Sequence, residues 1–326
     1  MILLWGLAED GPLGVVCAEL DRLGADVVYV DQRLGIAYEM EVDDPARTWL
    51  CGPDIKIDLE SLVAACARPY NFTQLYDFAN LSPEDLRWRR MAHFEATLSG
   101  WCDTADALVV NRPTKMGSNS SKPYQQEVVI RSVGFRTPVT LLTTDPEEVR
   151  RFRAEHSDVI YKSISGWRSI VKRLSDEDVE TIADVQCCPT QFQAYVEGID
   201  YRVHVVGNEV FAARIRSCAD DYRYASDTDI EPVELDPLFS GACVRLCQRL
   251  KLHLGGIDLR QDRDGEWFCF EINPSPCFTC FDRDGYIARS LASQLVKRGP
   301  IRHAKGRTDP HPVADAREEP LLQSRT

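Results

Sequence analysis

The sequence lacks several features that would place it directly in a class of protein. No apolar run approaches the roughly 18–20 residues of a membrane-spanning helix. Basic residues are few: 38 Lys and Arg against 51 Asp and Glu give a net charge of -13, which argues against a nucleic-acid-binding surface. The apolar start lacks a basic segment and reaches Glu9 and Asp10 too early for a signal peptide. We therefore expect a cytoplasmic protein whose partners include neither membrane nor nucleic acid.

Dense cysteine clusters are also missing. The 12 cysteines are scattered along 326 residues, unlike those of short disulfide-rich secreted chains, so reduced thiols are the expected state. Cys277 and Cys280 form one CxxC, and Cys187-Cys188 is a vicinal pair. No second pair with metal-ligand spacing accompanies them, so a zinc or redox protein is only an alternative, which metal analysis would test.

A Gly-x-Gly-x-x-Gly motif is absent after the first β-rich run, so no dinucleotide site is expected there. The runs "ILLWGL" and "DVVYVD" flank Gly14–Leu23, which has helical spacing. This β-α-β pattern predicts a Rossmann-like α/β domain. A helix is then expected from Ser82-Pro83-Glu84, with Ser82 as N-cap, to about Cys102, followed by the strand "DALVVN".

The rest of the chain alternates helices and strands without internal repeats. "YRVHVVGN" and "EVFAARIRS" predict a hairpin turned at Gly207-Asn208. The other expected elements are a helix at about Lys122–Ser132, a strand at Thr137–Thr143, a helix after Asp145-Pro146, a strand at Asp158–Lys162, and helices at about Pro237–Leu250 and Asp284–Lys297. From about residue 299 to 326 the chain is polar and aperiodic, which predicts a disordered tail.

The stretch "GGIDLRQDRDGEWFCFEINPSP" places two carboxylates and an amide on β-rich segments. If Asp264-Gly265 is a two-residue turn, Asp258 lies opposite Glu271, and Asn273 shares their face. The three side chains then converge within about 5–8 Å. A hard cation resolves the repulsion, and Mg²⁺ binds through one or two carboxylates plus substrate phosphates.

Two alternatives stay open for this stretch. The acids could be hydrated on a solvent-facing strand edge. A turn longer by one residue would place Asp258 on the wrong face. The loop "NPSP", which begins at Asn273, favours a built site over a hydrated edge.

Other polar residues could serve nucleotide phosphates. Lys162 ends the strand "DVIYK", where an ammonium can reach a phosphate, and Lys122 follows a polar loop. The hinge in "QFQAYVEG" could read an adenine edge, with Glu197 accepting from ribose hydroxyls. If the arginines on the following hairpin all point inward, they would form a cluster for phosphate and oxyanion charge. Otherwise they are ordinary surface residues. They are Arg202, Arg214 and Arg216.

In this order, the features resemble the ATP-grasp ligases from about Asn111 to Val296. Within them the chain is similar to the RimK and glutathione-synthetase-like branch, including the microviridin-type (graspetide) peptide ligases. The motifs that carry the resemblance are "NSSKPYQ", "VIYKSISG", "FQAYVEGIDYRVHVVGNEVFAARIRS" and "GGIDLRQDRDGEWFCFEINPSP". The resemblance implies an α/β (α+β) chain with an N-terminal Rossmann-like pre-ATP-grasp domain at 1–105, a central lid subdomain at 106–190 and a C-terminal antiparallel-sheet subdomain with the metal site at 191–298.

The resemblance also implies roles for residues. Lys122 and Lys162 would contact ATP phosphates, and the three hairpin arginines would face the acyl-phosphate region. The segment after Lys162 has one glycine and no Gly-x-Gly, so lid closure would depend on Ser163, Ser165 and Gly166. Residues Gln193, Ala194, Tyr195 and Val196 would hold adenine, Glu197 or Asp200 would lie near ribose, and Asp258, Glu271 and Asn273 would bind two Mg²⁺ ions.

The implied reaction is ATP-dependent ligation of a carboxylate to an amine or alcohol through an acyl-phosphate, which releases ADP and phosphate. The substrates would be small molecules or a peptide, and a precursor with a leader peptide would be one such partner. A homodimer stays open. A non-catalytic nucleotide-binding or regulatory protein on the same fold is the alternative. Cys277 and Cys280 are expected to line the substrate side of the cleft.

Overall fold

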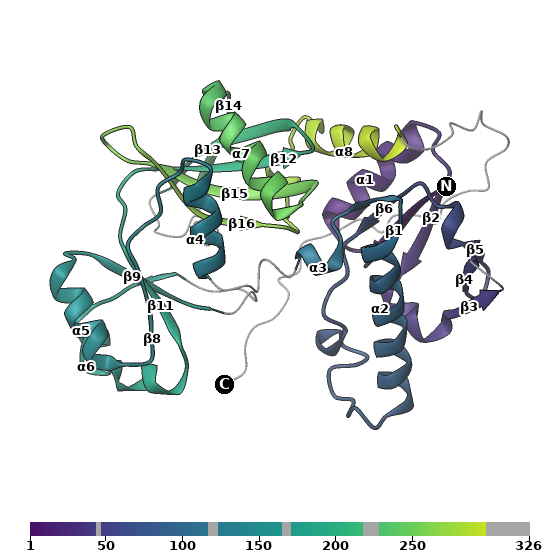
Figure 1. Ribbon diagram of the computed structural model, residues 1–326, viewed down its shortest axis with the longest axis horizontal. Helices are drawn as coiled ribbons and strands as arrows, with labels where there is room; N and C mark the ends of the chain where they lie inside the picture. The colour runs from purple at the N-terminus through teal and green to yellow at the C-terminus, as the bar shows by residue number, and fades with distance from the viewer. Residues whose placement is uncertain (44–46, 117–122, 165–170, 218–227, 298–326) are drawn as a thin grey trace.

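The computed structural model describes residues 1–43, 47–116, 123–164, 171–217 and 228–297. The described elements gather into three regions (Figure 1). The predicted tail at 299–326 lies outside the described residues. Among the helices that the structure describes, none is both long and apolar enough to cross a membrane.

The N-terminal region is built on a four-stranded parallel sheet of order β2-β1-β6-β7, which confirms the predicted β-α-β opening. A small antiparallel sheet, β3-β4-β5, lies beside it. The elements are β1 (Ile2–Gly6), α1 (Gly11–Arg22), β2 (Val27–Asp31), η1 (Gln32–Ala37), β3 (Glu39–Asp43), β4 (Arg47–Cys51), β5 (Lys56–Asp58), η2 (Leu59–Ser61), β6 (Ala64–Ala67), η3 (Phe72–Gln74), α2 (Leu86–Thr104) and β7 (Leu108–Val110).

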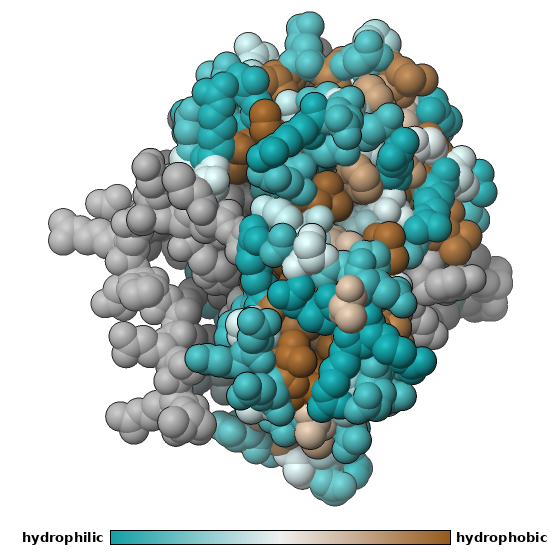
Figure 2. All heavy atoms as spheres, turned by 90° about the vertical axis from the view of Figure 1, so that its left-hand side faces the viewer, coloured by the Kyte–Doolittle hydropathy of each residue, from teal (hydrophilic) through white to brown (hydrophobic). Residues whose placement is uncertain are grey.

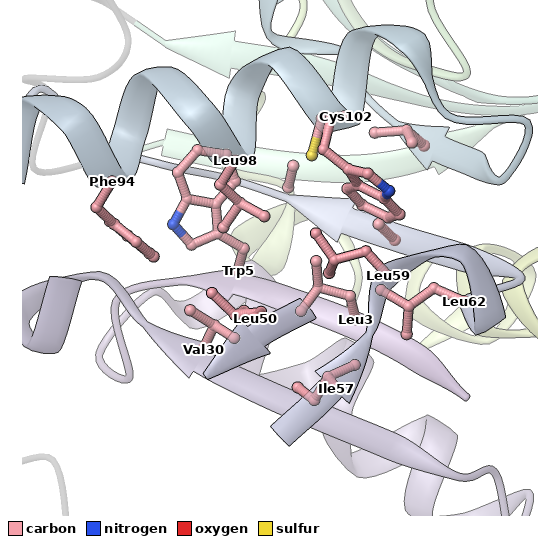
Figure 3. Close-up of a cluster of buried hydrophobic side chains, with 14 of the residues drawn as sticks. Leu3, Trp5, Val30, Leu50, Ile57, Leu59, Leu62, Phe94, Leu98 and Cys102 are labelled. Atoms are coloured by element: carbon pink, nitrogen blue, oxygen red, sulfur yellow. The ribbon is translucent and has the colours of Figure 1, made fainter. Parts of the chain in front are cut away.

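The start predicted for helix α2 is wrong. Ser82 begins only a turn, in which its carbonyl accepts from the Asp85 N–H at 3.0 Å. Asp85 is the N-cap, since its carboxylate accepts from the Arg87 N–H at 2.8 Å. One face of α2 then covers the core of this region, where Phe94, Leu98 and Cys102 lie over Trp5 and Leu3 (Figure 3). The fully buried side chains of this core include Leu3, Trp5, Leu50, Leu59, Met91 and Leu98.

The central region holds an antiparallel sheet of order β10-β9-β11-β8, with α5 and α6 beside it (Figure 1). The side of the molecule that is on the left in Figure 1 is mainly hydrophilic, with apolar side chains in small separate groups (Figure 2). The helix predicted after Asp145-Pro146 is confirmed as α5, and Asp145 caps it, with the Glu147 N–H donating to the Asp145 carboxylate at 2.9 Å. The elements are α3 (Pro113–Met116), α4 (Pro123–Ser132), β8 (Thr140–Thr143), α5 (Pro146–Glu155), β9 (Val159–Ser163), β10 (Lys172–Arg173), α6 (Asp176–Glu180), η5 (Ile182–Cys187) and β11 (Thr190–Ala194).

The C-terminal region is a five-stranded antiparallel sheet of order β14-β13-β12-β15-β16. The hairpin at Gly207-Asn208 and the helix Pro237–Leu250 occur as predicted. Helices α4 and α7 pack on one face of the sheet, and α8 packs on the other beside α1. The elements are β12 (Ile199–Val206), β13 (Glu209–Ser217), β14 (Thr228–Val233), α7 (Pro237–Leu250), β15 (Leu254–Gln261), β16 (Trp267–Asn273), η7 (Thr279–Phe281) and α8 (Tyr286–Val296).

The predicted domain boundaries stay predictions, but two elements near them are placed by contacts. Strand β11 pairs with β8 and β9, so the central sheet includes residues beyond 190. Helix α4 contributes Ile130 to the core of the C-terminal sheet, although it precedes the central sheet in the chain. The chain therefore passes from α4 to the central sheet and back to the C-terminal sheet.

Candidate functional site

The predicted pairing of the two acids is confirmed. Asp258 on β15 lies directly opposite Glu271 on β16, and Asn273 lies opposite Gly256. Directly paired residues share a face of the sheet, so two carboxylates and an amide lie together. On β12, Arg202 pairs with Asp258 and His204 with Gly256, which adds both to this face.

The turn that was to fix this register is different. The loop is one residue longer than predicted. Within it, the Asp262 carboxylate accepts from the N–H groups of Asp264 and Glu266, and Gly265 takes a φ of 83°. This alone would shift the pairing by one residue. A β-bulge at Phe270 compensates, since Leu259 pairs with Cys269 while Asp258 pairs with Glu271.

Each carboxylate is paired with a cation. Arg202 Nη1 lies 2.5 Å from Asp258 Oδ1 within the sheet, and the Arg202 side chain is only 8% exposed. Lys162 Nζ lies 3.2 Å from Glu271 Oε2. Lys162 comes from β9 of the central sheet, so this ion pair joins the two sheets. The candidate site therefore lies where Lys162 of the central sheet meets the charged face of the C-terminal sheet.

Gly256 makes room for this arrangement. A Cβ at this position would lie 2.6 Å from Arg202 Nη2 and 2.6 Å from Pro276 Cβ. Both contacts are far below van der Waals distance, so only glycine lets the guanidinium and the loop after Asn273 meet here. Sequence reasoning missed this role, although "GGID" before the acid marks a close approach of backbone.

The donor set fits Mg²⁺. Asp258 and Glu271 offer carboxylate oxygens, and Asn273 Oδ1 accepts from the Ser275 N–H at 2.9 Å, which orients the amide. Among the residues that the structure describes, no three His, Cys, Asp or Glu side chains form a metal-binding group. Two carboxylates and an amide oxygen match a magnesium site that is completed by phosphate oxygens.

The central sheet presents a polar face toward this site. Gln191 pairs with Lys162, and Gln193 lies two residues further, so all three side chains share one face. Gln193 is 3% exposed, its Nε2 donates to Thr140 Oγ1 at 3.0 Å, and its Oε1 is buried without a partner among the described residues. The role predicted for Gln193 in adenine binding stays a prediction. Gln191 was missed, although "TQFQA" alternates glutamines at a period of two.

The predicted hinge is held by protein contacts. The Ala194 N–H donates to Val139 O at 2.9 Å and the Tyr195 N–H to Asp158 O at 2.8 Å. Val196 O accepts from Arg260 Nη1 at 2.7 Å.

The two carboxylates predicted near ribose differ. Asp200 receives two hydrogen bonds from Arg260, at 2.7 and 2.8 Å, so its carboxylate is occupied in fixing the hinge. Glu197 is 61% exposed and pairs with Arg263 of the β15–β16 loop. The exposed Glu197 is therefore the better placed of the two to meet a ligand.

The predicted convergence of three arginines is wrong. Arg202 pairs with Ala213, whereas Arg214 pairs with Tyr201, so Arg214 lies on the opposite face of the sheet from Arg202. Arg214 Nη2 is 2.5 Å from Glu231 Oε2 on β14, and Arg216, two residues further on the same face as Arg214, is exposed. Of the three hairpin arginines, Arg202 alone lies on the face of the paired acids.

The remaining predicted phosphate contacts lie at or beyond the ends of described segments. Ser163 is exposed at the end of β9. Lys122, Ser165 and Gly166 lie outside the described residues, and their roles stay predictions.

Asn111 is a supporting residue that sequence reasoning missed. It is 2% exposed, and its Nδ2 donates to Leu254 O and Pro274 O, both at 2.6 Å. Its Oδ1 accepts from the N–H groups of His253 and Leu254 at 2.8 and 3.2 Å. One side chain therefore fixes the loop after Asn273 to the start of β15.

A buried ionic network supports the other end of the same loop. Arg68 Nε lies 2.8 Å from Asp10 Oδ1, and Arg68 Nη1 donates to Pro276 O at 3.2 Å. The Tyr70 hydroxyl donates to Asp10 Oδ2 at 2.8 Å, and burial, with the Asp10 charge, raises the pKa of Tyr70 to about 12. The N-terminal region thereby holds the loop that follows Asn273.

Cys277 and Cys280 are both free and exposed in the loop after the acids. Cys277 Sγ lies 3.5 Å from Thr279 Oγ1. Partial desolvation of the Cys280 thiol, followed by the charge of the neighbouring Cys277, raises the pKa of Cys280, while the charge of Arg202 acts to lower it. The expected position of the two cysteines on the substrate side of the cleft stays a prediction.

The chain is similar in sequence to known proteins over part of its length. The model of the RimK-like ATP-grasp domain matches residues 121–298. A curated relative, β-citrylglutamate synthase B of Danio rerio, is 32% identical over 123 residues, which are 34% of this chain and 30% of the relative's length.

Solved structures match almost the whole chain. A RiPP-associated ATP-grasp ligase of Chryseobacterium gregarium, in complex with ADP and a leader and core peptide, has a TM-score of 0.79 at 23% identity, and the match covers 92% of this chain and 97% of that chain. The macrocyclase MdnC of Microcystis aeruginosa, bound to its precursor peptide, has a TM-score of 0.77 at 19% identity and covers 91% and 99%. The ligase PsnB with a minimal precursor has a TM-score of 0.75 at 28% identity and covers 91% and 99%.

Proposed function

The chain belongs to the RimK-like ATP-grasp family, and from this premise we propose that it ligates a carboxylate to an amine or alcohol at the expense of ATP. The observation that carries the proposal is the meeting of Lys162, from the central sheet, with Glu271 beside the Arg202–Asp258 pair. Two cations and two carboxylates at one contact between sheets suit a bound nucleoside triphosphate with its metal ion.

The residues have distinct roles in the proposed reaction. Asp258, Glu271 and Asn273 would hold Mg²⁺, which supplies charge neutralisation of the phosphates. Lys162 exchanges its contact with Glu271 for a phosphate oxygen. Arg202 faces the charge that develops on the transferred group and stabilises it.

The chemistry has two steps. A carboxylate oxygen of the substrate attacks the γ-phosphorus, and the bond to the bridging oxygen breaks so that ADP leaves. The nucleophile then attacks the acyl carbon, the carbon–oxygen bond to phosphate breaks, and the nucleophile gives up its proton as phosphate leaves. No protein nucleophile is required, so the rate gain comes from positioning and charge stabilisation.

We propose a peptide as the substrate. PsnB in complex with its minimal precursor is 28% identical and covers 91% of this chain, whereas the β-citrylglutamate synthase match covers 34%. A ribosomal precursor with a leader segment is therefore favoured over a free metabolite. A short precursor-peptide gene beside the gene for this chain would support this choice.

The test is ADP release with mass spectrometry of the product. The probes are synthetic peptides with Asp or Glu and Lys, Ser or Thr side chains, including any peptide encoded beside the gene, and citrate with L-glutamate as the metabolite pair. We expect ADP to form only with Mg²⁺ and a peptide carboxylate, with loss of water from the peptide mass. Glu271→Gln and Asp258→Asn should reduce turnover at least about 100-fold, whereas Glu266→Gln, on the same hairpin, should not. Full turnover of both site variants at limiting Mg²⁺ would refute the metal assignment.

A further inference from the structure

The ladder between β15 and β16 ends beside the paired acids. Its last pair at this end is Gly256 with Asn273, and the next residue, Pro274, has no N–H with which to continue the pairing. Leu254, two residues before Gly256, pairs with Val206 of β12. Leu254 and Pro274 are both buried, so the backbone polar groups that the ladder leaves over need partners from another part of the chain.

Asn111 supplies these partners. Its amide has the donor and the acceptor of a peptide group. Its Nδ2 donates to Leu254 O and to Pro274 O, both at 2.6 Å, and its Oδ1 accepts from the Leu254 N–H at 3.2 Å. The side chain therefore takes the place of a further pair of strand residues. Because Asn111 directly follows β7, the bridge between the start of β15 and the end of β16 comes from the N-terminal region.

The bridge is made next to a predicted metal ligand. Pro274 is bonded directly to Asn273, and Asn273 Oδ1 accepts from the Ser275 N–H at 2.9 Å. The Asn273 amide is thus fixed to the backbone on the far side of Pro274. A displacement of Pro274 would carry this amide away from its place beside Asp258 and Glu271.

The same loop has a second support, which lies further from the ligand. Arg68 Nη1 donates to Pro276 O at 3.2 Å, and Arg68 is itself held by Asp10 at 2.8 Å. The bond to Pro276 lies three residues beyond Asn273, whereas the bond from Asn111 lies one residue beyond it. Loss of the Asn111 bonds should therefore loosen Asn273 while Arg68 still holds the far end of the loop.

We propose that Asn111 is a positioning residue of the metal site, because its hold on Pro274 sets where the Asn273 amide lies and so sets the affinity of the site for a divalent cation. The inference rests on the proposed function, because it concerns the cation that the proposed reaction uses. It makes the N-terminal region part of the metal site, although all three predicted ligands come from the C-terminal sheet. Partners that orient a metal ligand typically change metal affinity about 10- to 100-fold when they are replaced.

The test measures metal binding without turnover. Mn²⁺, which takes the same kinds of oxygen ligand as Mg²⁺, is titrated into the full-length protein with the non-hydrolysable ATP analogue AMPPNP and followed by electron paramagnetic resonance. Asn111→Ala removes all the bonds of the amide, and Asn111→Asp replaces the donating group by a carboxylate oxygen that faces the two carbonyls. We expect each variant to weaken Mn²⁺ binding at least about tenfold.

Arg112→Ala is the matched control for a loss of stability alone. Arg112, the next residue in the chain, donates to Ala105 O at 2.8 Å and to Ala107 O at 3.3 Å, both in the N-terminal region. Its replacement should lower the urea midpoint of unfolding, as the Asn111 variants do, but leave Mn²⁺ affinity within about twofold of wild type. An equal loss of Mn²⁺ affinity in Arg112→Ala and Asn111→Ala, at comparable urea midpoints, would show that Asn111 acts on the fold alone.

A measurement on the wild-type protein keeps the proposal testable if the Asn111 variants do not fold. Coupling between two sites is reciprocal, so a metal–nucleotide complex that Asn111 helps to bind must also stabilise the bonds of Asn111. The His253 N–H donates to Asn111 Oδ1 at 2.8 Å, so its hydrogen exchange reports on these bonds. We expect Mg²⁺ with AMPPNP to slow this exchange at least about threefold more than that of the Ala105 N–H at the end of α2. Equal effects on the two amides would contradict the coupling.

Two outcomes separate the positioning role from the proposed function. If the wild-type protein binds Mn²⁺ with AMPPNP and both Asn111 variants bind it equally well, the metal site is correct and the role of Asn111 is wrong. If the wild-type protein binds no Mn²⁺ in the presence of AMPPNP, the proposed metal–nucleotide site is wrong, and the role of Asn111 is refuted with it.

Discussion

At the scale of single residues, the lack of a side chain at Gly256 determines where the Arg202 guanidinium lies. Gly256 stands between His204 on β12 and Asn273 on β16, and a Cβ there would meet Arg202 Nη2 and Pro276 at 2.6 Å. Arg202 would have to leave Asp258, or the loop after Asn273 would have to shift. The absence of one methyl group thus determines where a charge lies.

We predict that Gly256→Ala lowers ligation by about 10- to 100-fold and destabilises the fold by about 1–3 kcal/mol, the usual cost of overpacking. Gly14→Ala is the matched control, because a methyl group added to Gly14 would meet nothing within 4 Å and Gly14 is exposed on helix α1. That change should leave activity intact and raise stability by about 0.5–1 kcal/mol. Steady-state kinetics and urea unfolding measure both effects; equal behaviour of the two variants would contradict the packing argument.

At the scale of elements, the β15–β16 hairpin separates what a sequence can predict from what it cannot. The Asp258–Glu271 pair was predicted from a two-residue turn, and the pair is correct while the turn is not. Burial explains the outcome, because Leu259, Cys269 and Ile272 must reach the core, and a slip of one residue would expose all of them. The bulge at Phe270 compensates for the extra loop residue, and no residue pattern near Phe270 predicts a bulge.

The arginine hairpin shows the reverse case. The turn at Gly207-Asn208 was predicted correctly, and its register already pairs Arg214 with Tyr201 instead of placing it beside Arg202. The error lay in assuming that alternate residues of two strands face the same cleft. Support from distant segments, such as Asn111 beneath the loop after Asn273, depends on tertiary contacts and has no local signal.

The same reasoning predicts that deletion of Arg263 is tolerated. The loop would shorten to an Asp264-Gly265 turn, and the core residues of both strands would keep Asp258 opposite Glu271. We expect Mg²⁺-dependent activity within about 3-fold of wild type and a stability loss of less than about 1 kcal/mol from the facing charges of Asp262 and Glu266. Arg263→Ala is the control for loss of the Glu197 contact. Loss of activity in the deletion alone would show that the turn, and not the core, sets the register.

Helix α2 carries a pH-sensitive contact with η1. Burial raises the pKa of Glu95 to about 7, even though Gln32 Nε2 donates to its carboxylate and acts in the opposite direction. A raised folded-state pKa favours the folded state below the unfolded value of 4.5, and this contribution is lost as pH rises through about 7. Between about pH 4.5 and 7, we expect the unfolding free energy of the wild type to fall by on the order of 1–2 kcal/mol more than that of Glu95→Gln. Urea titrations at several pH values would measure it, and parallel pH profiles of wild type and variant would contradict it.

At the scale of the whole molecule, the proposed nucleotide site joins the central sheet to the C-terminal sheet. Lys162 belongs to the central sheet and Glu271 to the C-terminal sheet, while Arg68 of the N-terminal region holds the loop that follows Asn273. Buried apolar clusters around Trp5, Phe192 and Ile257 lie in the three regions, and a further cluster joins the N-terminal region to the C-terminal sheet and α8, while the central sheet has its own cluster. A ligand that contacts both sheets should therefore stabilise them together.

We predict that Mg²⁺ with ATP raises the Tm of the protein more than either alone, because a ligand that binds only the folded state stabilises it by RT ln(1 + [L]/Kd). Lys162→Ala and Glu271→Gln should each abolish most of the increase, since each removes one side of the contact between sheets. Lys172→Ala is the matched control, because Lys172 is an exposed lysine of the same sheet, on β10. Differential scanning calorimetry at fixed nucleotide concentration distinguishes the outcomes. An undiminished increase in Lys162→Ala would place the nucleotide away from this contact, and the proposed function would lose the observation that carries it.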